Sequence, residues 1–393
     1  MARELIISSY LFIFRIIFNI CKLFSLKEKT TFVASFGDNV EYVSEQLQKS
    51  SNEQIIILKK ASCRVTFEES ENLKVLDFET GNLNHFFQSI YHLATSKVVF
   101  TDNYFGFLSV TDFKSNVVCV QLWHAAGAIK KFGLMDPSIQ LRSERAKQRF
   151  KDVYERFDYV VVGSEKMSTI FRQSFGLTNE NILRTGIPRT DFFFDTDKVN
   201  RSKSAVYSSL PAIKGKKVIM YAPTFRDGEL NSPNIFLEVE QMYQELSDDY
   251  VLLLRLHPAV KFRLENKYPD FVYDVSGYQN INQLLLVTDL LITDYSSIPF
   301  EYSLLGKPMI FFTYDLDSYT TSRGFWEDYQ SNLPGPVAKT TGEVIKEIKK
   351  NQFDMDKVSA YATQWNQYSR GNASENIIKS VYGQEEEQVE ATN

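Results

Sequence analysis

The chain has 393 residues, of which 44% are hydrophobic and 24% are charged, with a formal net charge of −5. This length predicts two domains with sizeable cores, and the acidic balance argues against a general nucleic-acid binder. Three cysteines, Cys21, Cys63 and Cys119, show neither metal-ligand spacing nor a disulfide framework. We therefore expect a globular protein of a reducing, cytoplasmic setting with no nucleic-acid partner.

The N-terminal segment at residues 5–24 is strongly apolar and reads LIISSYLFIFRIIFNICKLF. As a helix it would be about 30 Å long, enough to cross a bilayer, but polar residues recur along one narrow stripe. Because a charge at the bilayer centre is costly, we expect a helix within residues 1–28 that lies in the membrane interface. The residues expected at the membrane are Phe12, Phe14, Arg15, Phe18 and Lys22. The alternative is a helix buried against the protein's own core.

Strand and helix signals alternate from residue 31 to about residue 195. Strands are expected at 31–36, 54–58, 97–101, 117–122 and 159–162. Helices are expected near 40–48, 84–94 and 165–175. This alternation predicts a parallel sheet with helices on both faces, and therefore a first Rossmann-like domain over residues 29–200.

The segment VVCVQLWHAAGAIKKFG, at residues 117–133, places a histidine where a strand ends. Ligands bind at the carboxyl ends of strands in open α/β sheets, and a neutral imidazole can act there as a general base. His124 is therefore a candidate catalytic residue, with a structural loop histidine as the alternative. The basic segment at 142–156 is either a solvated face or a surface for anionic lipid or a diphosphate.

Residues 191–215 are polar, contain Pro211 and predict an interdomain linker. A second α/β domain is expected over residues 201–380. Its strands are expected at 217–221, 250–256 and 290–293, and its helices at 235–246, 281–287, 341–349 and 355–368. The acidic tail at 381–393 is expected to be disordered.

Two loops of this second domain carry polar residues at the predicted carboxyl edge of the sheet. The loop APTFRD contains Thr224 and Arg226, and His257 follows the next strand. Arg226, Arg255 or His257 could hold a diphosphate, with a bidentate arginine contact as the stronger option.

The stretch LLITDYSSIPFEYSLLGKPMIFF, at residues 290–312, predicts a strand, a tight turn at 294–297, a helix, a short loop and another strand. Pro299 fits the first helical turn, and Gly306 ends the helix. The helix N-terminus favours an anion, to which Ser296 and Ser297 add hydroxyl donors. Glu301 is expected to reach a sugar hydroxyl of a bound nucleotide. The alternative is an ordinary capped helix.

The loop RGFWEDY, at residues 323–329, is expected to close over a base or the acceptor. No acidic cluster with metal-ligand spacing is visible in the sequence, nor is a Walker lysine motif or GxGxxG. We therefore predict neither a required metal nor a cofactor.

Five motifs together resemble a known family. QLWHAAGAIKKFG, YAPTFRD, LRLHP, LLITDYSSIPFEYSLLGKPMIFF and RGFWEDY occur in the order and spacing of the CDP-glycerol:glycerophosphotransferase family of wall teichoic acid synthesis. The similarity covers about residues 5 to 375. Within the family it is closest to the short primases, which share a TDNYF stretch like residues 101–105 and an N-terminal amphipathic membrane segment.

The resemblance implies a GT-B-like fold, with two Rossmann-like domains facing a cleft. It implies transfer of sn-glycerol 3-phosphate from CDP-glycerol to an undecaprenyl-diphosphate-linked N-acetylmannosaminyl-N-acetylglucosamine, with release of CMP. His124 would be the base for the acceptor hydroxyl, and His257 a second catalytic residue beside the donor. The implied substrate-binding residues are Thr224, Arg226, Asp294, Ser296, Ser297, Glu301, Lys130 and Arg323. Ala125-Ala126-Gly127 departs from the polar or proline-containing turn of many members, which bears on the acceptor contacts.

The implied location is the cytoplasmic face of the cell membrane in a Gram-positive bacterium, as a peripheral protein. Candidate partners are CDP-glycerol, the lipid-linked disaccharide, the membrane surface and other teichoic acid enzymes. Three alternatives remain open: a short poly(glycerol phosphate) polymerase, a GT-B glycosyltransferase that uses a nucleotide sugar, and an inert membrane-bound scaffold.

Overall fold

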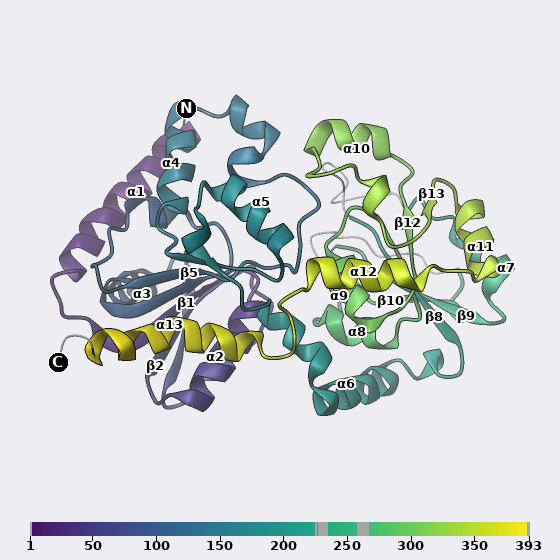
Figure 1. Ribbon diagram of the computed structural model, residues 1–393, viewed down its shortest axis with the longest axis horizontal. Coiled ribbons are helices and arrows are strands. Elements are labelled where there is room, and N and C mark those ends of the chain that lie inside the picture. Colours follow the sequence, from purple (N-terminus) through teal and green to yellow (C-terminus); the bar gives the residue numbers. More distant parts are fainter. Residues whose placement is uncertain (1, 225, 227–234, 258–266, 391–393) are drawn as a thin grey trace. The chain divides into compact units, whose positions relative to one another are not determined.

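The computed structural model describes residues 2–224, 226, 235–257 and 267–390, with the side chains of all of these except residues 2, 3, 322, 323 and 384–390. The chain divides into two compact units (Figure 1). Unit 1 comprises Met1–Ala125, Phe132–Asp191 and Gln367–Asn393, and unit 2 comprises Ala126–Lys131 and Phe192–Asn366. Each unit contains one parallel sheet, which confirms the prediction of two α/β domains.

Unit 1 contains a parallel sheet in the order β3-β2-β1-β4-β5-β6-β7 among its described residues. The strands are β1 (Lys27–Ala34), β2 (Gln54–Lys60), β3 (Leu73–Phe78), β4 (Ser96–Thr101), β5 (Val118–Gln121), β6 (Tyr159–Val161) and β7 (Ile182–Leu183). Central strands are buried on both faces, as continuous apolar runs in parallel sheets are. The strand order reverses between β1 and β4, which makes their carboxyl ends the switch point of the sheet.

The helices of unit 1 come from both ends of the chain. They are α1 (Ala2–Cys21), α2 (Asp38–Ser50), α3 (Leu83–Thr95), α4 (Glu144–Tyr154), α5 (Glu165–Phe175) and α13 (Ala373–Glu390). The tail predicted to be disordered from residue 381 is instead helical through Glu390, because α13 packs on α2 (Figure 1). The Tyr382 hydroxyl of α13 also lies 3.1 Å from Glu53, which directly precedes β2.

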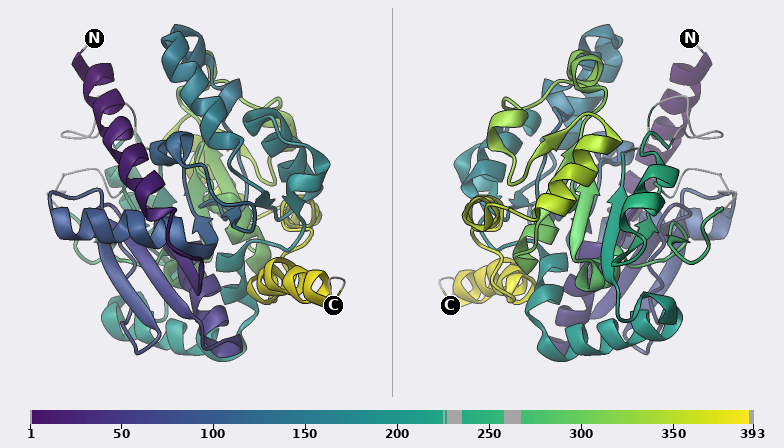
Figure 2. Two further views of the ribbon diagram at one scale, coloured as in Figure 1. Left: turned by 90° about the vertical axis from the view of Figure 1, so that its left-hand side faces the viewer. Right: turned by 90° about the vertical axis from the view of Figure 1, so that its right-hand side faces the viewer.

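Helix α1 packs along unit 1 against α3 (Figure 2, in purple). Phe14 and Phe18 are fully buried, with Phe14 against Phe86 and Phe107, and Phe18 against Phe113. The prediction that Phe14 and Phe18 contact a membrane is therefore wrong, because these rings fill the core of unit 1.

A second apolar face of α1 is exposed. Its large side chains are Leu5, Ile6, Phe12, Ile13, Ile16 and Ile20. Arg15 is exposed in the polar stripe, and Lys22 pairs with Asp112 at 3.1 Å. By length and composition alone, α1 could also cross a membrane.

Unit 2 contains a parallel sheet in the order β10-β9-β8-β11-β12-β13 among its described residues. The strands are β8 (Lys217–Ala222), β9 (Tyr250–Leu254), β10 (Val272–Asp274), β11 (Leu290–Thr293), β12 (Met309–Phe312) and β13 (Val337–Ala338). Their sequence order repeats that of the first six strands of unit 1. The equivalent switch point therefore lies between β8 and β11.

The helices of unit 2 are α6 (Thr196–Ser209), α7 (Val239–Leu246), α8 (Ile281–Val287), α9 (Ile298–Tyr302), α10 (Leu316–Arg323), α11 (Thr341–Lys350) and α12 (Met355–Trp365). Helix α6 occupies the predicted linker. The Asp195 side chain caps it by accepting from the Lys198 N–H, and Val206 is buried in the core. The chain passes from unit 1 to unit 2 between Asp191 and Phe192, at the start of the predicted linker, and the rest of that segment belongs to unit 2 as a capped surface helix.

The predicted strand, turn, helix and strand at 290–312 are confirmed. Pro299 lies in the first turn of α9, and Gly306 has φ of 60° after a short 3₁₀ segment. Ser297 precedes α9, but its side chain makes no capping hydrogen bond. Helix α9 has only 5 residues.

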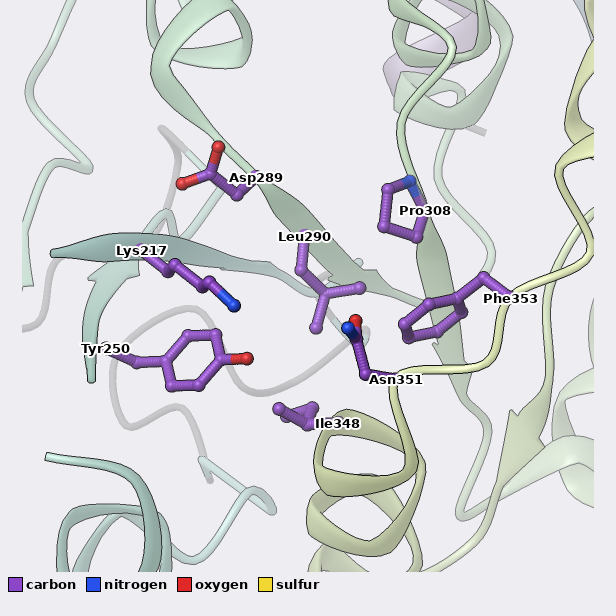
Figure 3. Close-up of a pocket in the computed structure, with 8 residues that line it drawn as sticks. All are labelled: Lys217, Tyr250, Asp289, Leu290, Pro308, Ile348, Asn351 and Phe353. Carbon is purple, nitrogen blue, oxygen red and sulfur yellow. The ribbon is translucent and has the colours of Figure 1, made fainter. Parts of the chain in front are cut away.

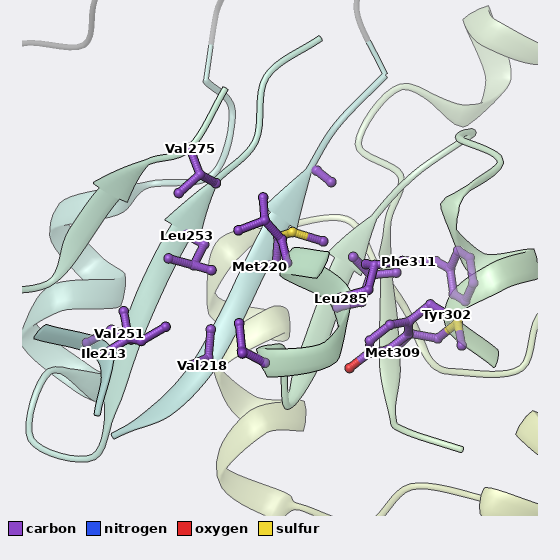
Figure 4. Close-up of a cluster of buried hydrophobic side chains, with 14 of the residues drawn as sticks. Ile213, Val218, Met220, Val251, Leu253, Val275, Leu285, Tyr302, Met309 and Phe311 are labelled. Atoms are coloured by element: carbon purple, nitrogen blue, oxygen red, sulfur yellow. The ribbon is translucent and has the colours of Figure 1, made fainter. Parts of the chain in front are cut away.

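The core of unit 2 covers both faces of its sheet. Val218 and Met220 of β8 belong to one buried cluster (Figure 4), and Ile219 and Tyr221 belong to another. Successive side chains of a strand point to opposite faces, so one strand contributes to both clusters. Because both faces of the sheet are packed, the strands that carry the polar loops are held in fixed positions.

A substitution at Gly335 can test this packing, because an added Cβ would overlap the carbonyl oxygen of Met309. We expect Gly335→Ala to lower the free energy of unfolding by about 1–3 kcal/mol, measured by urea denaturation. Gly277→Ala is the matched control, since a Cβ there meets nothing within 4 Å. Equal losses in both variants would contradict the close contact.

Candidate active site

His124 lies three residues beyond β5, at the carboxyl edge of the sheet in unit 1, and is half-buried. Its Nδ1 lies 3.2 Å from the backbone oxygen of Asp102. Because a carbonyl oxygen only accepts, Nδ1 carries the proton, and Nε2 carries the lone pair. This is the tautomer that a general base requires.

Aromatic rings enclose the His124 imidazole. Phe36 stacks on it with ring centroids 4.2 Å apart, and Trp123 does so at 4.3 Å. Burial lowers the pKa of His124 to about 4, and the nearby Arg189 also lowers it. The ring is therefore neutral at pH 7 and able to take a proton.

Three polar residues that sequence analysis did not assign to the site hold this loop. Asn39 bonds the carbonyls of Leu122 and Trp123, and Arg189 Nη1 donates to the His124 carbonyl at 3.2 Å. Asp102 supplies the carbonyl for the imidazole. Their position in the sequence was the available signal, since Asp102 directly follows the predicted strand 97–101 and Asn39 lies three residues after the predicted strand 31–36.

In unit 2, three predicted residues meet at the carboxyl ends of β8 and β11. The Asp294 carboxylate is buried, and it accepts from the Thr224 N–H at 2.7 Å and from Arg226 Nη2 at 3.0 Å. Burial raises the pKa of Asp294, which Arg226 opposes. The loop that carries Thr224 and Arg226 was predicted at the carboxyl edge of the sheet, and its contacts with Asp294 confirm that position.

Arg226 is more fully engaged than the sequence suggests. Its Nε and Nη2 donate to Asp315 at 2.8 and 3.0 Å, Nη2 also donates to Asp294, and Nη1 donates to the Thr224 carbonyl. The guanidinium also lies over the rings of Tyr295, Tyr314 and Tyr319. Arg226 therefore joins the loops that follow β8, β11 and β12.

The other predicted residues of unit 2 differ in exposure. Ser297 and His257 are exposed, Ser296 is half-buried with its hydroxyl 2.9 Å from Thr293 Oγ1, and Glu301 is buried within α9. Lys130 lies over the Tyr319 ring at 5.3 Å. Arg323 ends α10, and its side chain lies outside the described residues, as do Pro258 of the LRLHP motif and most of the loop after Arg226.

Metal ligands do not gather in the described part of the chain. No group of three or more His, Cys, Asp or Glu residues there could hold a metal ion.

A cavity of about 220 Å³ lies at the opposite edge of the unit 2 sheet (Figure 3). Lys217, Tyr250 and Leu290, at the amino ends of their strands, line it together with Phe353. Because the polar loops lie at the carboxyl ends, we do not assign this cavity to catalysis.

The Arg226–Asp294 pair predicts a large effect on stability. Removing one partner of a buried ion pair leaves an uncompensated charge, so we expect Arg226→Gln to lower the free energy of unfolding by about 3–5 kcal/mol in urea denaturation. Arg184→Gln is the matched control, because Arg184 forms a surface pair with Glu165 and should cost at most about 1 kcal/mol. Similar small losses in both variants would show that the Asp294 carboxylate is not left uncompensated when Arg226 is removed.

Comparisons with known proteins identify relatives of the whole chain. The family model described as CDP-glycerol:poly(glycerophosphate) glycerophosphotransferase matches residues 16–383. The chain is 35% identical over 381 residues to the teichoic acid glycerol-phosphate primase of Bacillus subtilis, covering 96% of this chain and 98% of that protein. It is 36% identical over 395 residues to the teichoic acid poly(ribitol-phosphate) polymerase of Bacillus spizizenii, covering 96% of this chain and 60% of that protein.

Solved structures of the wall teichoic acid polymerase TagF are also similar. One has a TM-score of 0.81 at 26% identity and covers 99% of both chains. A TagF variant soaked with CDPG has a TM-score of 0.80 at 27% identity and covers 93% of this chain and 91% of that one. Since the family model spans nearly the whole sequence, the chain belongs to the CDP-glycerol:poly(glycerophosphate) glycerophosphotransferase family and is a CDP-glycerol glycerophosphotransferase of teichoic acid synthesis.

Proposed function

We propose that this enzyme primes wall teichoic acid. It transfers sn-glycerol 3-phosphate from CDP-glycerol to a hydroxyl of undecaprenyl-diphosphate-linked N-acetylmannosaminyl-N-acetylglucosamine. The observation that carries the proposal is the His124 imidazole, neutral and with Nδ1 against a carbonyl oxygen. The identity to a primase over almost its whole length supports this acceptor. A GT-B arrangement is part of the same proposal.

The reaction is an in-line displacement at the phosphorus atom that carries glycerol. The acceptor hydroxyl oxygen forms a bond to this phosphorus, and the bond from the phosphorus to the bridging diphosphate oxygen breaks. CMP leaves with the bridging oxygen, and the hydroxyl proton passes to Nε2 of His124. Positioning and charge stabilisation supply most of the acceleration in such reactions.

We assign the donor to the carboxyl edge of unit 2. The Thr224, Ser296 and Ser297 hydroxyls can bond phosphate oxygens. His257, Lys130 and Arg323 can neutralise charge, with His257 in a catalytic place at the leaving phosphate, and Glu301 can accept from a hydroxyl. Because Arg226 already binds two carboxylates, we expect it to act mainly by holding Asp294 and Asp315 in place.

We assign α1 to the cytoplasmic face of the membrane, where a lipid-linked acceptor would be found. The exposed apolar face, with Phe12, Ile16 and Ile20, would enter the interface, and Arg15 would meet lipid headgroups. Helix α4 is bound to α1 through the Arg149–Glu4 pair at 3.2 Å. Its exposed Arg145 and Lys151 would add attraction to anionic lipid.

The function is tested by incubating the enzyme with CDP-glycerol and the lipid-linked disaccharide and by measuring CMP release and product mass. We expect one added glycerol phosphate per acceptor. His124→Gln should lower kcat by about 10²–10⁴-fold, because it removes the proton acceptor, and His85→Gln, in α3 where the His85 ring pairs with Asp77 of β3, should not.

Other products would identify the alternatives. A ladder of additions would indicate a poly(glycerol phosphate) polymerase, which the likeness to TagF favours. Turnover of a nucleotide sugar in place of CDP-glycerol would overturn the donor assignment. A near-normal rate for His124→Gln would remove this residue from the base role.

Membrane attachment is tested by vesicle flotation of the triple variant Phe12→Ser, Ile16→Ser, Ile20→Ser. We expect partitioning onto anionic vesicles to weaken by roughly tenfold or more, since three large apolar side chains would no longer leave water. Leu141→Ser is the control, because Leu141 is 91% exposed outside α1. Unchanged flotation of the triple variant would assign attachment to another surface.

A further inference from the structure

We propose that Asp102 and Asn39 are positioning residues that hold the His124 imidazole in one tautomer and one orientation. For the reaction, this inference rests on the proposed role of His124 as the base. Neither residue needs to touch a substrate, because both act through the loops that follow β1, β4 and β5.

The Asp102 carboxylate binds the turn that follows β1. It accepts from the backbone N–H groups of Ser35 at 2.9 Å, Phe36 at 2.8 Å and Gly37 at 2.8 Å. Such successive N–H groups form a concave anion site. Gly37 is required there, because its φ is 96° and an added Cβ would lie 2.6 Å from Cys63 Sγ.

Asp102 and the turn that it binds each contact the His124 imidazole. The Asp102 backbone oxygen contacts Nδ1 of His124 at 3.2 Å, and the Phe36 ring stacks on the imidazole with an interplanar angle of 12°. The contacts of the Asp102 carboxylate therefore fix two groups. One is the Asp102 backbone oxygen, which selects the tautomer of His124, and the other is the Phe36 ring, which orients the imidazole.

Asn39 fixes the chain immediately before His124. Its side chain is buried, and Nδ2 donates to the carbonyls of Leu122 at 3.1 Å and Trp123 at 2.9 Å. Its Oδ1 accepts from the Arg189 N–H at 3.0 Å. Trp123 has φ of 59°, which a bulky residue adopts only when its surroundings impose it. Asn39 is therefore placed to keep this turn in the conformation that directs His124.

The inference is tested with Asp102→Asn and Asn39→Ala in the full chain. We expect kcat to fall by about 100-fold, as small displacements of catalytic groups do, while the Kd for CDP-glycerol stays within twofold. Asp77→Asn, at the end of β3 in the same sheet, is the control and should keep normal kcat. Normal kcat in both Asp102→Asn and Asn39→Ala would overturn the proposal, as would an equal loss of donor affinity.

Chemical rescue distinguishes positioning from a general folding effect. In Asp102→Ala, the three N–H groups of the turn remain, and formate can supply the missing carboxylate. We expect formate to restore kcat several-fold, whereas chloride at the same ionic strength should not. Equal effects of both anions would argue against a specific carboxylate site.

A nitrogen-15 NMR spectrum separates this inference from the proposed function, because it needs no turnover. The wild-type enzyme should show His124 protonated at Nδ1 alone, and Asp102→Asn should show a mixture of tautomers. A wild-type Nε2–H tautomer would overturn the inference even if the variants do not fold. Absence of turnover with the expected tautomer would instead overturn the proposed function alone.

Discussion

A buried aspartate after the fourth strand joins the two central loops of each sheet. In unit 1, Asp102 follows β4 and binds the N–H groups of the turn after β1. In unit 2, Asp294 follows β11 and binds the Thr224 N–H after β8. Because a buried carboxylate is tolerated only when it is fully partnered, the two loops at each switch point cannot move independently. The candidate site residues of each unit lie on or beside these loops.

The two units satisfy this carboxylate differently. Backbone N–H groups donate to the Asp102 carboxylate, whereas the Asp294 carboxylate also forms an ion pair with Arg226. The turn that contacts phosphates in many doubly wound sheets is thus occupied in unit 1 by the protein's own carboxylate. Unit 2 instead places the hydroxyls of Ser296 and Ser297 at its switch point, where Arg226 holds Asp294 and Asp315. This difference supports the assignment of the nucleotide to unit 2.

The strand and helix pattern predicted the elements that carry the sites, because apolar periodicity reports burial. It placed His124 at the end of a strand and Arg226 near Asp294. It did not reveal that Arg226 also binds Asp315, or that Asn39 supports His124, since such pairings depend on which loops meet in three dimensions. Periodicity shows that a face is apolar, but not what covers it.

Helix α1 illustrates this limit. Its sequence allowed either a membrane helix or a core helix, and the structure buries one apolar face of this helix in the core and leaves a second apolar face exposed. Phe14 and Phe18 fill the core, while Phe12 and Ile16 are exposed. Helix α6 shows the opposite case, in which a mostly polar sequence needed only Val206 and a capping Asp195 to fold on unit 2.

The position of α13 has a consequence for how the chain folds during synthesis. Unit 1 begins at the N-terminus, yet α13, which packs on α2, is made after the whole of unit 2. Unit 2 is nearly continuous, so its sheet can form as soon as residues 192–366 have left the ribosome. Domains usually fold from the N-terminus during translation. Here the first unit to emerge is completed after the second, and α2 stays without α13 until residues 373–390 have left the ribosome.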